Sequence, residues 1–161
     1  MFAAVKPVDV ASPEEMAALG ERLGHALLAG DLVGLVGDLG AGKTVFVQGL
    51  ARGLGVPAEA HVTSPTFTLV NDHVGGRLVL HHVDLYRLER AAELAELGLD
   101  ELCAGDDVVA IEWCDRFPSV LAHGHLELRL ERTSESGRRV YAAARGEAAC
   151  ALLERWGAFS A

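Results

Sequence analysis

The chain has 161 residues, half of them apolar, and a formal net charge of −9. This length suits one domain, residues 1–161, built around one hydrophobic core. The acidic balance argues against direct binding of nucleic acid, because the neutralisation of phosphates supplies most of the affinity in such complexes.

The sequence gives no sign of membrane insertion or secretion. No apolar stretch approaches the roughly 18 residues that span a bilayer, and no basic region followed by a long apolar run opens the chain. The three cysteines, Cys103, Cys114 and Cys150, show no C-x-x-C spacing. We therefore expect a reduced, cytoplasmic setting.

The predicted elements follow the order of an α/β protein. A short strand at 2–5 precedes a helix that opens with the capping box Ser12-Pro13-Glu14-Glu15 and ends before Gly30. Next come a strand at 31–36, a helix at 45–52, strands at 67–71 and 77–84, a helix at 89–97, a short helix from 98, an apolar strand at 107–111, paired strands at 125–131 and 138–143, and a helix at 147–156. This order predicts a three-layer sandwich of the P-loop NTPase type, with a mostly parallel sheet and antiparallel hairpin strands.

A complete phosphate-binding motif, G-x-x-x-x-G-K-T, lies between the strand at 31–36 and the helix at 45–52. Glycines let backbone N–H groups surround a polyphosphate, and the helix N-terminus adds the positive end of its dipole. Lys43 would contact the β- and γ-phosphates, and the Thr44 hydroxyl would hold Mg²⁺. The predicted nucleotide-binding residues are Gly37, Asp38, Leu39, Gly40, Ala41, Gly42, Lys43, Thr44 and Val45. Neither lysine stands in the N-K-x-D motif typical of GTPases, so ATP is the expected nucleotide.

Two acidic residues, Asp84 and Glu112, directly follow predicted apolar strands. Open α/β sheets bind ligands at this end of their strands, and a Mg²⁺–triphosphate site needs a carboxylate and a group that orients water. The alternative for each acid is a helix cap or a solvent-facing side chain. Trp113 could stack on the nucleotide or belong to the core. His81 and His82 alternate faces on their strand, so at most one of them faces the site.

Several short blocks together resemble the TsaE family, also called YjeE. The blocks are Gly37-Asp-Leu-Gly-Ala-Gly-Lys-Thr44, Thr63-Ser-Pro-Thr-Phe67, His82-Val-Asp-Leu-Tyr-Arg-Leu88, Leu97-Gly-Leu-Asp-Glu101 and Ile111-Glu-Trp113. They occur in the family's order over residues 12–117. The chain is similar to that family in all of them, but Val45 and Cys114 stand where many relatives carry Thr and Pro.

The resemblance implies an ATPase needed for the threonylcarbamoyl modification of adenosine 37 in tRNA. It implies that the protein acts on a TsaB–TsaD heterodimer, so that tRNA is met only indirectly, through the partners. Carried over by position, Lys43 and Thr44 bind phosphate and Mg²⁺, and Asp84 supports the metal or the attacking water. Glu112 is the favoured hydrolysis residue and a second metal ligand, and Trp113 lies beside the nucleotide.

Two other functions stay open at the level of sequence. A nucleotide-gated binding module would use the same loop with negligible hydrolysis. A small-molecule kinase would also need an acceptor pocket under an Arg-rich lid, and no such lid segment is evident. We further expect 63–67 and 84–88 to move with the nucleotide, because their polar groups could contact the γ-phosphate.

Overall fold

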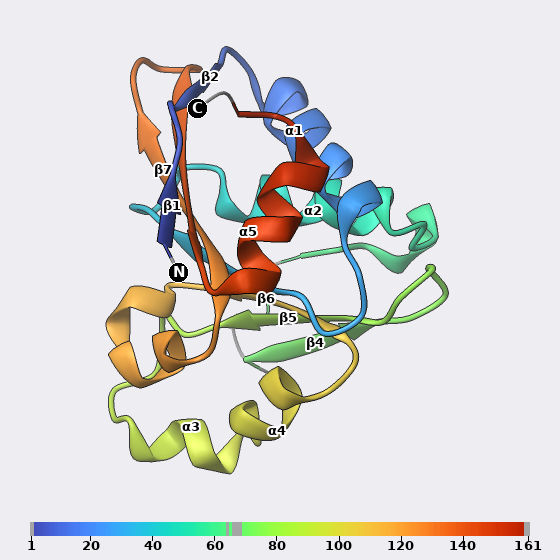
Figure 1. The fold of residues 1–161 in the computed structure, drawn as a ribbon, viewed down its shortest axis with the longest axis vertical. Coiled ribbons are helices and arrows are strands. Elements are labelled where there is room, and N and C mark those ends of the chain that lie inside the picture. Colours follow the sequence, from blue (N-terminus) through green and yellow to red (C-terminus); the bar gives the residue numbers. More distant parts are fainter. Residues whose placement is uncertain (1, 64, 66–68, 160–161) are drawn as a thin grey trace.

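The computed structural model describes residues 2–63, 65 and 69–159. Within these ranges the chain forms a mixed β-sheet with helices on both of its faces (Figure 1). The strands are β1 (Phe2–Ala4), β2 (Val8–Val10), β3 (Leu32–Val36), β4 (Val70–His73), β5 (Leu80–Asp84), β6 (Val108–Glu112), β7 (His125–Arg132) and β8 (Arg138–Arg145). The α-helices are α1 (Pro13–Ala26), α2 (Lys43–Gly53), α3 (Ala92–Glu96), α4 (Leu99–Ala104) and α5 (Glu147–Trp156), and 3-10 turns occupy Ala58–Ala60, Cys114–Arg116 and Pro118–Ala122.

The sheet has a parallel centre and antiparallel edges. Its order is β1-β8-β7-β3-β6-β5-β4, and β2 also pairs with β8. Among the described strands, three pairings are parallel and four are antiparallel. The prediction of a mostly parallel sheet is therefore wrong. The β4–β5 and β7–β8 pairs contribute antiparallel edges, and β8 also pairs antiparallel with β1 and with β2, which sequence analysis missed.

Successive residues of the central strands supply two separate cores. On β6, Val108 and Ala110 pack in one apolar cluster, and Val109 and Ile111 pack in the other. The first cluster joins the sheet to α1, α2 and α5, and the second joins it to α3 and α4, as Figure 1 shows. Such alternation is expected for a strand covered on both faces. The three-layer arrangement is thus confirmed.

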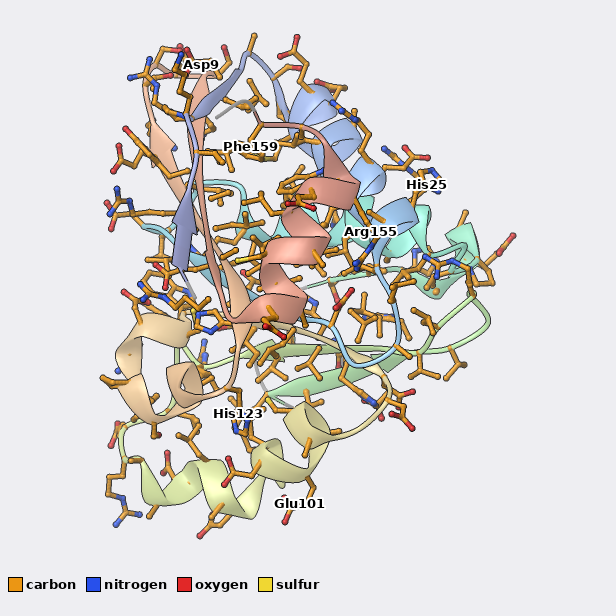
Figure 2. The ribbon with its side chains drawn as sticks, viewed as in Figure 1. Asp9, His25, Glu101, His123, Arg155 and Phe159 are labelled. Atoms are coloured by element: carbon orange, nitrogen blue, oxygen red, sulfur yellow. The ribbon has the colours of Figure 1, made fainter. Side chains whose placement is uncertain are left out.

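The C-terminal helix closes the first core. Trp156 packs edge-on against Phe46 of α2, with ring centroids 6.1 Å apart, and Phe159, labelled in Figure 2, also packs on Trp156, with centroids 4.9 Å apart. The Arg155 guanidinium donates to the Ala26 carbonyl at 3.0 Å. Helix α5 therefore ties together the C-terminal end of α1 and the body of α2.

The predicted start of α1 is confirmed, and its predicted end is not. The Ser12 hydroxyl accepts the Glu15 N–H at 3.1 Å, and the Glu15 carboxylate accepts the Ala11 N–H at 2.6 Å. The helix ends at Ala26, three residues earlier than predicted, because Leu27 is extended and buried. Burial of the Leu27 side chain in the core therefore ends the helix before Gly30 is reached.

Helices α1 and α2 pack unusually closely through small residues. The glycines at their contact are Gly20, Gly24, Gly49 and Gly53. A Cβ added to Gly49 would lie 2.0 Å from the Ala17 carbonyl oxygen, and one added to Gly24 would lie 2.3 Å from the Leu50 carbonyl oxygen. Real Cβ contacts essentially never fall below 3.0 Å. The orientation of α2, and of the loop before it, therefore depends on glycine at these positions.

Other predicted boundaries shift by a few residues. The predicted strand at 67–71 is replaced by β4 from Val70, and part of the predicted range lies outside the described residues. Strand β5 begins at Leu80 instead of residue 77, and α3 spans only Ala92–Glu96. The hairpin of β7 and β8 and the bounds of α5 are confirmed. Among the described helices, none is long and apolar enough to cross a membrane.

Candidate functional site

The loop between β3 and α2 depends on glycine for its shape. Gly40 and Gly42 have φ of 81° and 104°, in the left-handed region that glycine tolerates best. A Cβ added to Gly37 would lie 2.6 Å from the Leu130 carbonyl oxygen. Helix α2 begins at Lys43, directly after Gly42, which places the first turn of the helix against the loop. The predicted strand–loop–helix context of the motif is present.

Lys43 lies inside this loop and is only 5% exposed. Its ammonium donates to the Gly37 carbonyl at 2.5 Å and to the Asp38 carbonyl at 2.9 Å, and it lies 4.1 Å from the centre of the Trp113 ring. Burial lowers the pKa of Lys43, while the nearby charges of Glu112 and Asp84 act in the opposite direction. The site thus holds a desolvated cation beside the loop.

Two carboxylates stand side by side at the C-terminal ends of neighbouring strands. Asp84 ends β5 and Glu112 ends β6, and the two residues are paired in the parallel register. Both are buried, Glu112 to 2% exposure. The Asp84 carboxylate accepts the Tyr86 N–H at 2.9 Å. Sequence analysis placed each acid after a strand, and the register adds that the two are adjacent.

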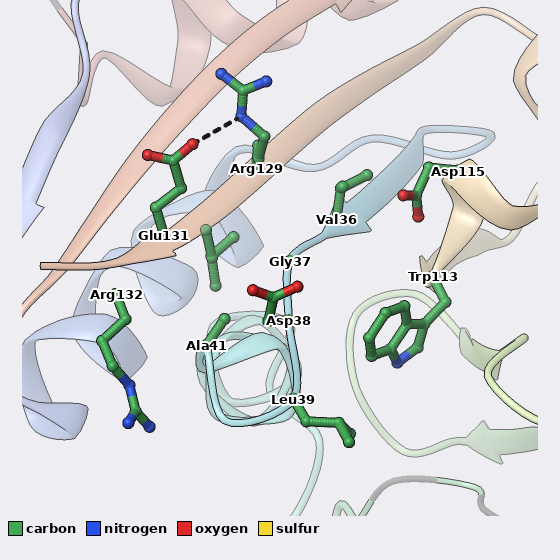
Figure 3. Close-up of a pocket in the computed structure, with 11 residues that line it drawn as sticks. Val36, Gly37, Asp38, Leu39, Ala41, Trp113, Asp115, Arg129, Glu131 and Arg132 are labelled. Atoms are coloured by element: carbon green, nitrogen blue, oxygen red, sulfur yellow. Dashed lines mark ion pairs between the residues drawn. The ribbon is translucent and has the colours of Figure 1, made fainter.

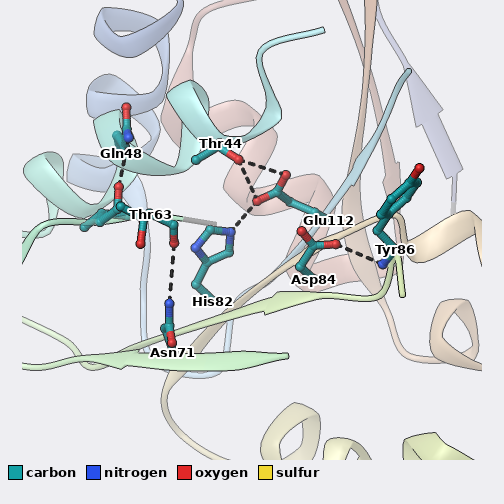
Figure 4. Close-up of polar contacts among 9 residues, drawn as sticks. Thr44, Gln48, Thr63, Asn71, His82, Asp84, Tyr86 and Glu112 are labelled. Atoms are coloured by element: carbon teal, nitrogen blue, oxygen red, sulfur yellow. Dashed lines mark hydrogen bonds and ion pairs between the residues drawn. The ribbon is translucent and has the colours of Figure 1, made fainter. Parts of the chain in front are cut away.

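Glu112 is the centre of a polar chain that reaches α2 (Figure 4). The Thr44 hydroxyl lies 3.2 Å from each of its carboxylate oxygens. On its other side, Nε2 of His82 lies 2.5 Å from Oε2. His82 is fully buried on the same face of β5 as Asp84, since side chains two residues apart on a strand share a face. The sequence alone assigns no role to His82, although its two-residue spacing from Asp84 is the signal that places it on the same face.

Trp113 follows β6 in a left-handed conformation that is rare for a bulky residue, with φ of 61°. Its backbone N–H donates to the Leu35 carbonyl at 2.9 Å, and its ring packs on Tyr86 with centroids 4.9 Å apart. Arg116 holds Tyr86 in turn through a hydrogen bond to its carbonyl. The Trp113 ring therefore covers the Lys43 ammonium and is only partly buried against the core.

These residues line one cavity of about 400 Å³. Its lining residues are Leu39, Gly40, Gly42, Lys43, Thr44, Val45, Asp84, Tyr86, Arg87, Glu112 and Trp113. A second cavity, of about 630 Å³, adjoins Trp113 and the loop (Figure 3). Gly37, Asp38 and Ala41 line the second cavity, together with Arg129 and Arg132 of β7. Each predicted site residue therefore lines at least one of the two cavities.

Only Thr63 and Pro65 of the predicted segment at 63–67 belong to the described residues. Ser64, Thr66 and Phe67 lie outside the described residues. Thr63 is exposed, and its carbonyl accepts from the Asn71 side chain at 3.5 Å. The link between this segment and a γ-phosphate therefore stays a prediction.

The side chains of the site could hold a metal ion only together with another ligand. Within the described ranges, no group of three or more His, Cys, Asp or Glu side chains could hold a metal ion by itself. Thr44, Glu112 and Asp84 instead offer a hydroxyl and two carboxylates next to the loop. Mg²⁺ commonly takes one or two carboxylates and completes its shell with water and substrate phosphates, so these residues fit it.

Comparisons with known proteins point to one family. A family model described as "Threonylcarbamoyl adenosine biosynthesis protein TsaE" matches residues 10–140. The tRNA threonylcarbamoyladenosine biosynthesis protein TsaE of Bacillus subtilis is 37% identical over 89% of this chain and 90% of its own length. The protein of the same name from Nostoc sp. is 46% identical over 69% of each chain. The crystal structure of Bacillus subtilis YdiB matches with a TM-score of 0.80 at 30% identity, covering 98% of this chain and 96% of that chain.

The fold and the site first define a class: an α/β protein with a glycine-rich loop facing two buried carboxylates at the C-terminal ends of neighbouring parallel strands. Within that class, the chain belongs to the TsaE family of threonylcarbamoyl adenosine biosynthesis proteins. The resemblance of its short sequence blocks to this family is confirmed.

Proposed function

We propose that this chain is a Mg²⁺-dependent ATPase that serves threonylcarbamoyladenosine synthesis at position 37 of tRNA. On this proposal, residues 1–161 form a single domain of the P-loop NTPase class. The observation that carries the proposal is the meeting of Lys43, Thr44, Asp84 and Glu112 around one cavity beside the glycine-rich loop. A cation, a hydroxyl and two carboxylates at a helix N-terminus are the groups that bind a metal–triphosphate.

The local geometry fits a bound polyphosphate. Side chains are absent at Gly37, Gly40 and Gly42, so the backbone of the loop can approach a ligand closely. The Lys43 ammonium lies within the loop, where turning from the Gly37 and Asp38 carbonyls would bring it to a phosphate. Its burial makes this interaction stronger than it would be in water.

In the proposed mechanism, Thr44 and Glu112 would hold Mg²⁺, and Asp84 would support the metal or its water ligands. When bound, Mg²⁺ supplies positive charge that neutralises the phosphate oxygens. Glu112 orients the attacking water and accepts its proton, and Lys43 and the loop amides stabilise the charge that develops on the γ-phosphate. Trp113 shields the phosphates from bulk water, since its ring already covers Lys43.

We infer further that hydrolysis is coupled to a partner complex, as the family resemblance implies for TsaB–TsaD. The net charge of −9 supports an indirect relation to tRNA, because the chain would repel a polyanion at long range. Tyr86, 40% exposed, and Leu39, 67% exposed, lie at the mouth of the cavity and offer apolar contacts to a partner.

The test is ATP hydrolysis by the purified protein with Mg²⁺, alone and with a TsaB–TsaD pair, with Glu112→Gln as the loss variant. We expect slow turnover alone and strong stimulation by the pair. Glu112→Gln should lower stimulated turnover by at least about 100-fold, the usual cost of losing a general base, while ATP still binds.

Three results would contradict parts of the proposal. Full turnover without the pair would remove the partner-coupled mechanism. Equal turnover by Glu112→Gln would favour the nucleotide-gated binding module. Phosphoryl transfer to a small-molecule acceptor in preference to water would favour the kinase.

A further inference from the structure

We propose that His82 is the positioning residue for Glu112: its Nε2–H holds the carboxylate in the orientation that hydrolysis requires. The inference rests on the function proposed above, because it assigns a role relative to Glu112. It adds a residue that lies outside the loop and outside the pair of strand-end acids.

The contact is short, direct and buried. Nε2 of His82 lies 2.5 Å from Oε2 of Glu112, and the side-chain exposures of the two residues are 0% and 3%. A carboxylate that is out of reach of bulk water needs donors from the protein. Among the described residues, the Thr44 hydroxyl and the His82 ring contact the Glu112 carboxylate as donors. Thr44 would turn its oxygen to the metal, which leaves His82 as the donor that persists.

The neighbouring charge explains why the carboxylate needs to be held. Asp84 is paired with Glu112 in the register of β5 and β6, so two acidic side chains share one end of the sheet. Lys43 attracts Glu112 from the loop side. Without a fixed donor, the carboxylate could swing toward the ammonium and lose its alignment. The His82 bond opposes that movement from the side of β5.

The other ring nitrogen of His82 fits the same assignment. Nδ1 is buried and has no hydrogen-bond partner among the described residues. A bare Nδ1 costs less than a buried N–H without an acceptor, so the proton belongs on Nε2, which faces Glu112. The unused nitrogen thus supports the Nε2–H tautomer.

Side-chain amides give a matched pair of variants. The amide nitrogen of His82→Gln stands as many bonds from the backbone as Nε2 and can replace the donor. The amide of His82→Asn matches Nδ1 in reach and falls short of Glu112. Both variants bury the same polar group, so they differ chiefly in whether the N–H reaches the carboxylate.

We expect His82→Asn to lower stimulated kcat by about 10- to 100-fold, the range typical of groups that orient a metal ligand, while His82→Gln stays within about 5-fold of the wild type. The KM for ATP should change much less than kcat in both variants, because the contact acts on the attacking water. His125→Leu, at another buried strand histidine that makes no contact with Glu112, should leave kcat unchanged.

A second measurement needs no turnover. Long-range ¹H–¹⁵N spectra of the free wild-type protein should show the proton of His82 on Nε2. A proton on Nδ1 with a bare Nε2 would overturn the proposal, as would equal loss of kcat in the Gln and Asn variants or no loss in either. If the wild type fails to hydrolyse ATP even with the partner pair, the proposed function fails, and the tautomer still decides whether His82 donates to Glu112.

Discussion

Helix α2 is used in two different ways at its start and along its flank. Its first residues, Lys43 and Thr44, carry polar groups into the candidate site, where they meet Glu112 at the C-terminal end of β6. Its flank carries Gly49 and Gly53, which contact the backbone of α1 so closely that no side chain fits. The position of the polar residues at the start of α2 therefore depends on glycines along its flank. The two regions should fail in different ways when they are changed.

The largest effect is expected at the start of the helix. Lys43→Ala should lower ATP hydrolysis by at least about 100-fold, since it removes a donor aimed at transition-state charge. We expect little loss of stability, because the substitution also removes the desolvation cost that lowers the pKa of Lys43. Measuring ATP turnover and urea unfolding on the same preparation would separate loss of activity from loss of stability. The other lysine of the chain, Lys6, is exposed, so Lys6→Ala should change neither turnover nor stability. Strong unfolding of the Lys43 variant would contradict this division of roles.

The flank should show the opposite behaviour. Gly49→Ala forces a methyl group to 2.0 Å from the Ala17 carbonyl oxygen, so we expect a loss of about 2–3 kcal/mol in the free energy of unfolding. Helix propensity alone would give a gain of about 1 kcal/mol for the same change, so the sign of the result is decisive. Denaturant titration measures it. In Gly105→Ala the new Cβ would meet only ordinary contacts, and that variant should unfold like the wild type.

A smaller effect is expected on the other face of β5. Nδ1 and Nε2 of His81 lie 2.6 and 2.8 Å from the carboxylates of Asp72 and Asp107. Burial lowers the pKa of His81, but the hydrogen bonds and charges of these acids outweigh burial, and the net pKa is raised. A raised folded pKa gives stability that is complete below the unfolded value of about 6.5 and lost as pH rises through the folded value.

The measurement is the difference in unfolding free energy between wild type and His81→Gln at pH 6 and at pH 9. The difference should shrink at pH 9 and stay within about 1 kcal/mol, because the side chains of Asp72 and Asp107 are 60% and 46% exposed and solvent screens both contacts. A stability difference that grows from pH 6 to pH 9 would contradict a raised pKa of His81 in the folded protein.

The sequence by itself determined the features that depend on residues within a few positions of one another. The spacing from Gly37 to Thr44 placed the loop between a strand and a helix, and Ser12 with Glu15 marked the start of α1. Strict alternation in 125–131 and a short turn predicted the β7–β8 pair. These signals are local, because one turn or one strand supplies both the cause and its effect.

Only the tertiary structure decided which distant residues meet. The register of β5 against β6 set Asp84 beside Glu112 and aimed His82 at the same carboxylate, across 30 residues of chain. The β7–β8 hairpin could be foreseen, but the pairing of β1 and β2 with β8, which adds to the antiparallel edges of the sheet, could not. The glycine contact of α1 with α2 also lies between segments that each read as an ordinary helix. Many registers and helix pairings satisfy the local patterns equally, and the choice among them depends on how the whole chain buries its apolar surface without leaving polar groups unpaired.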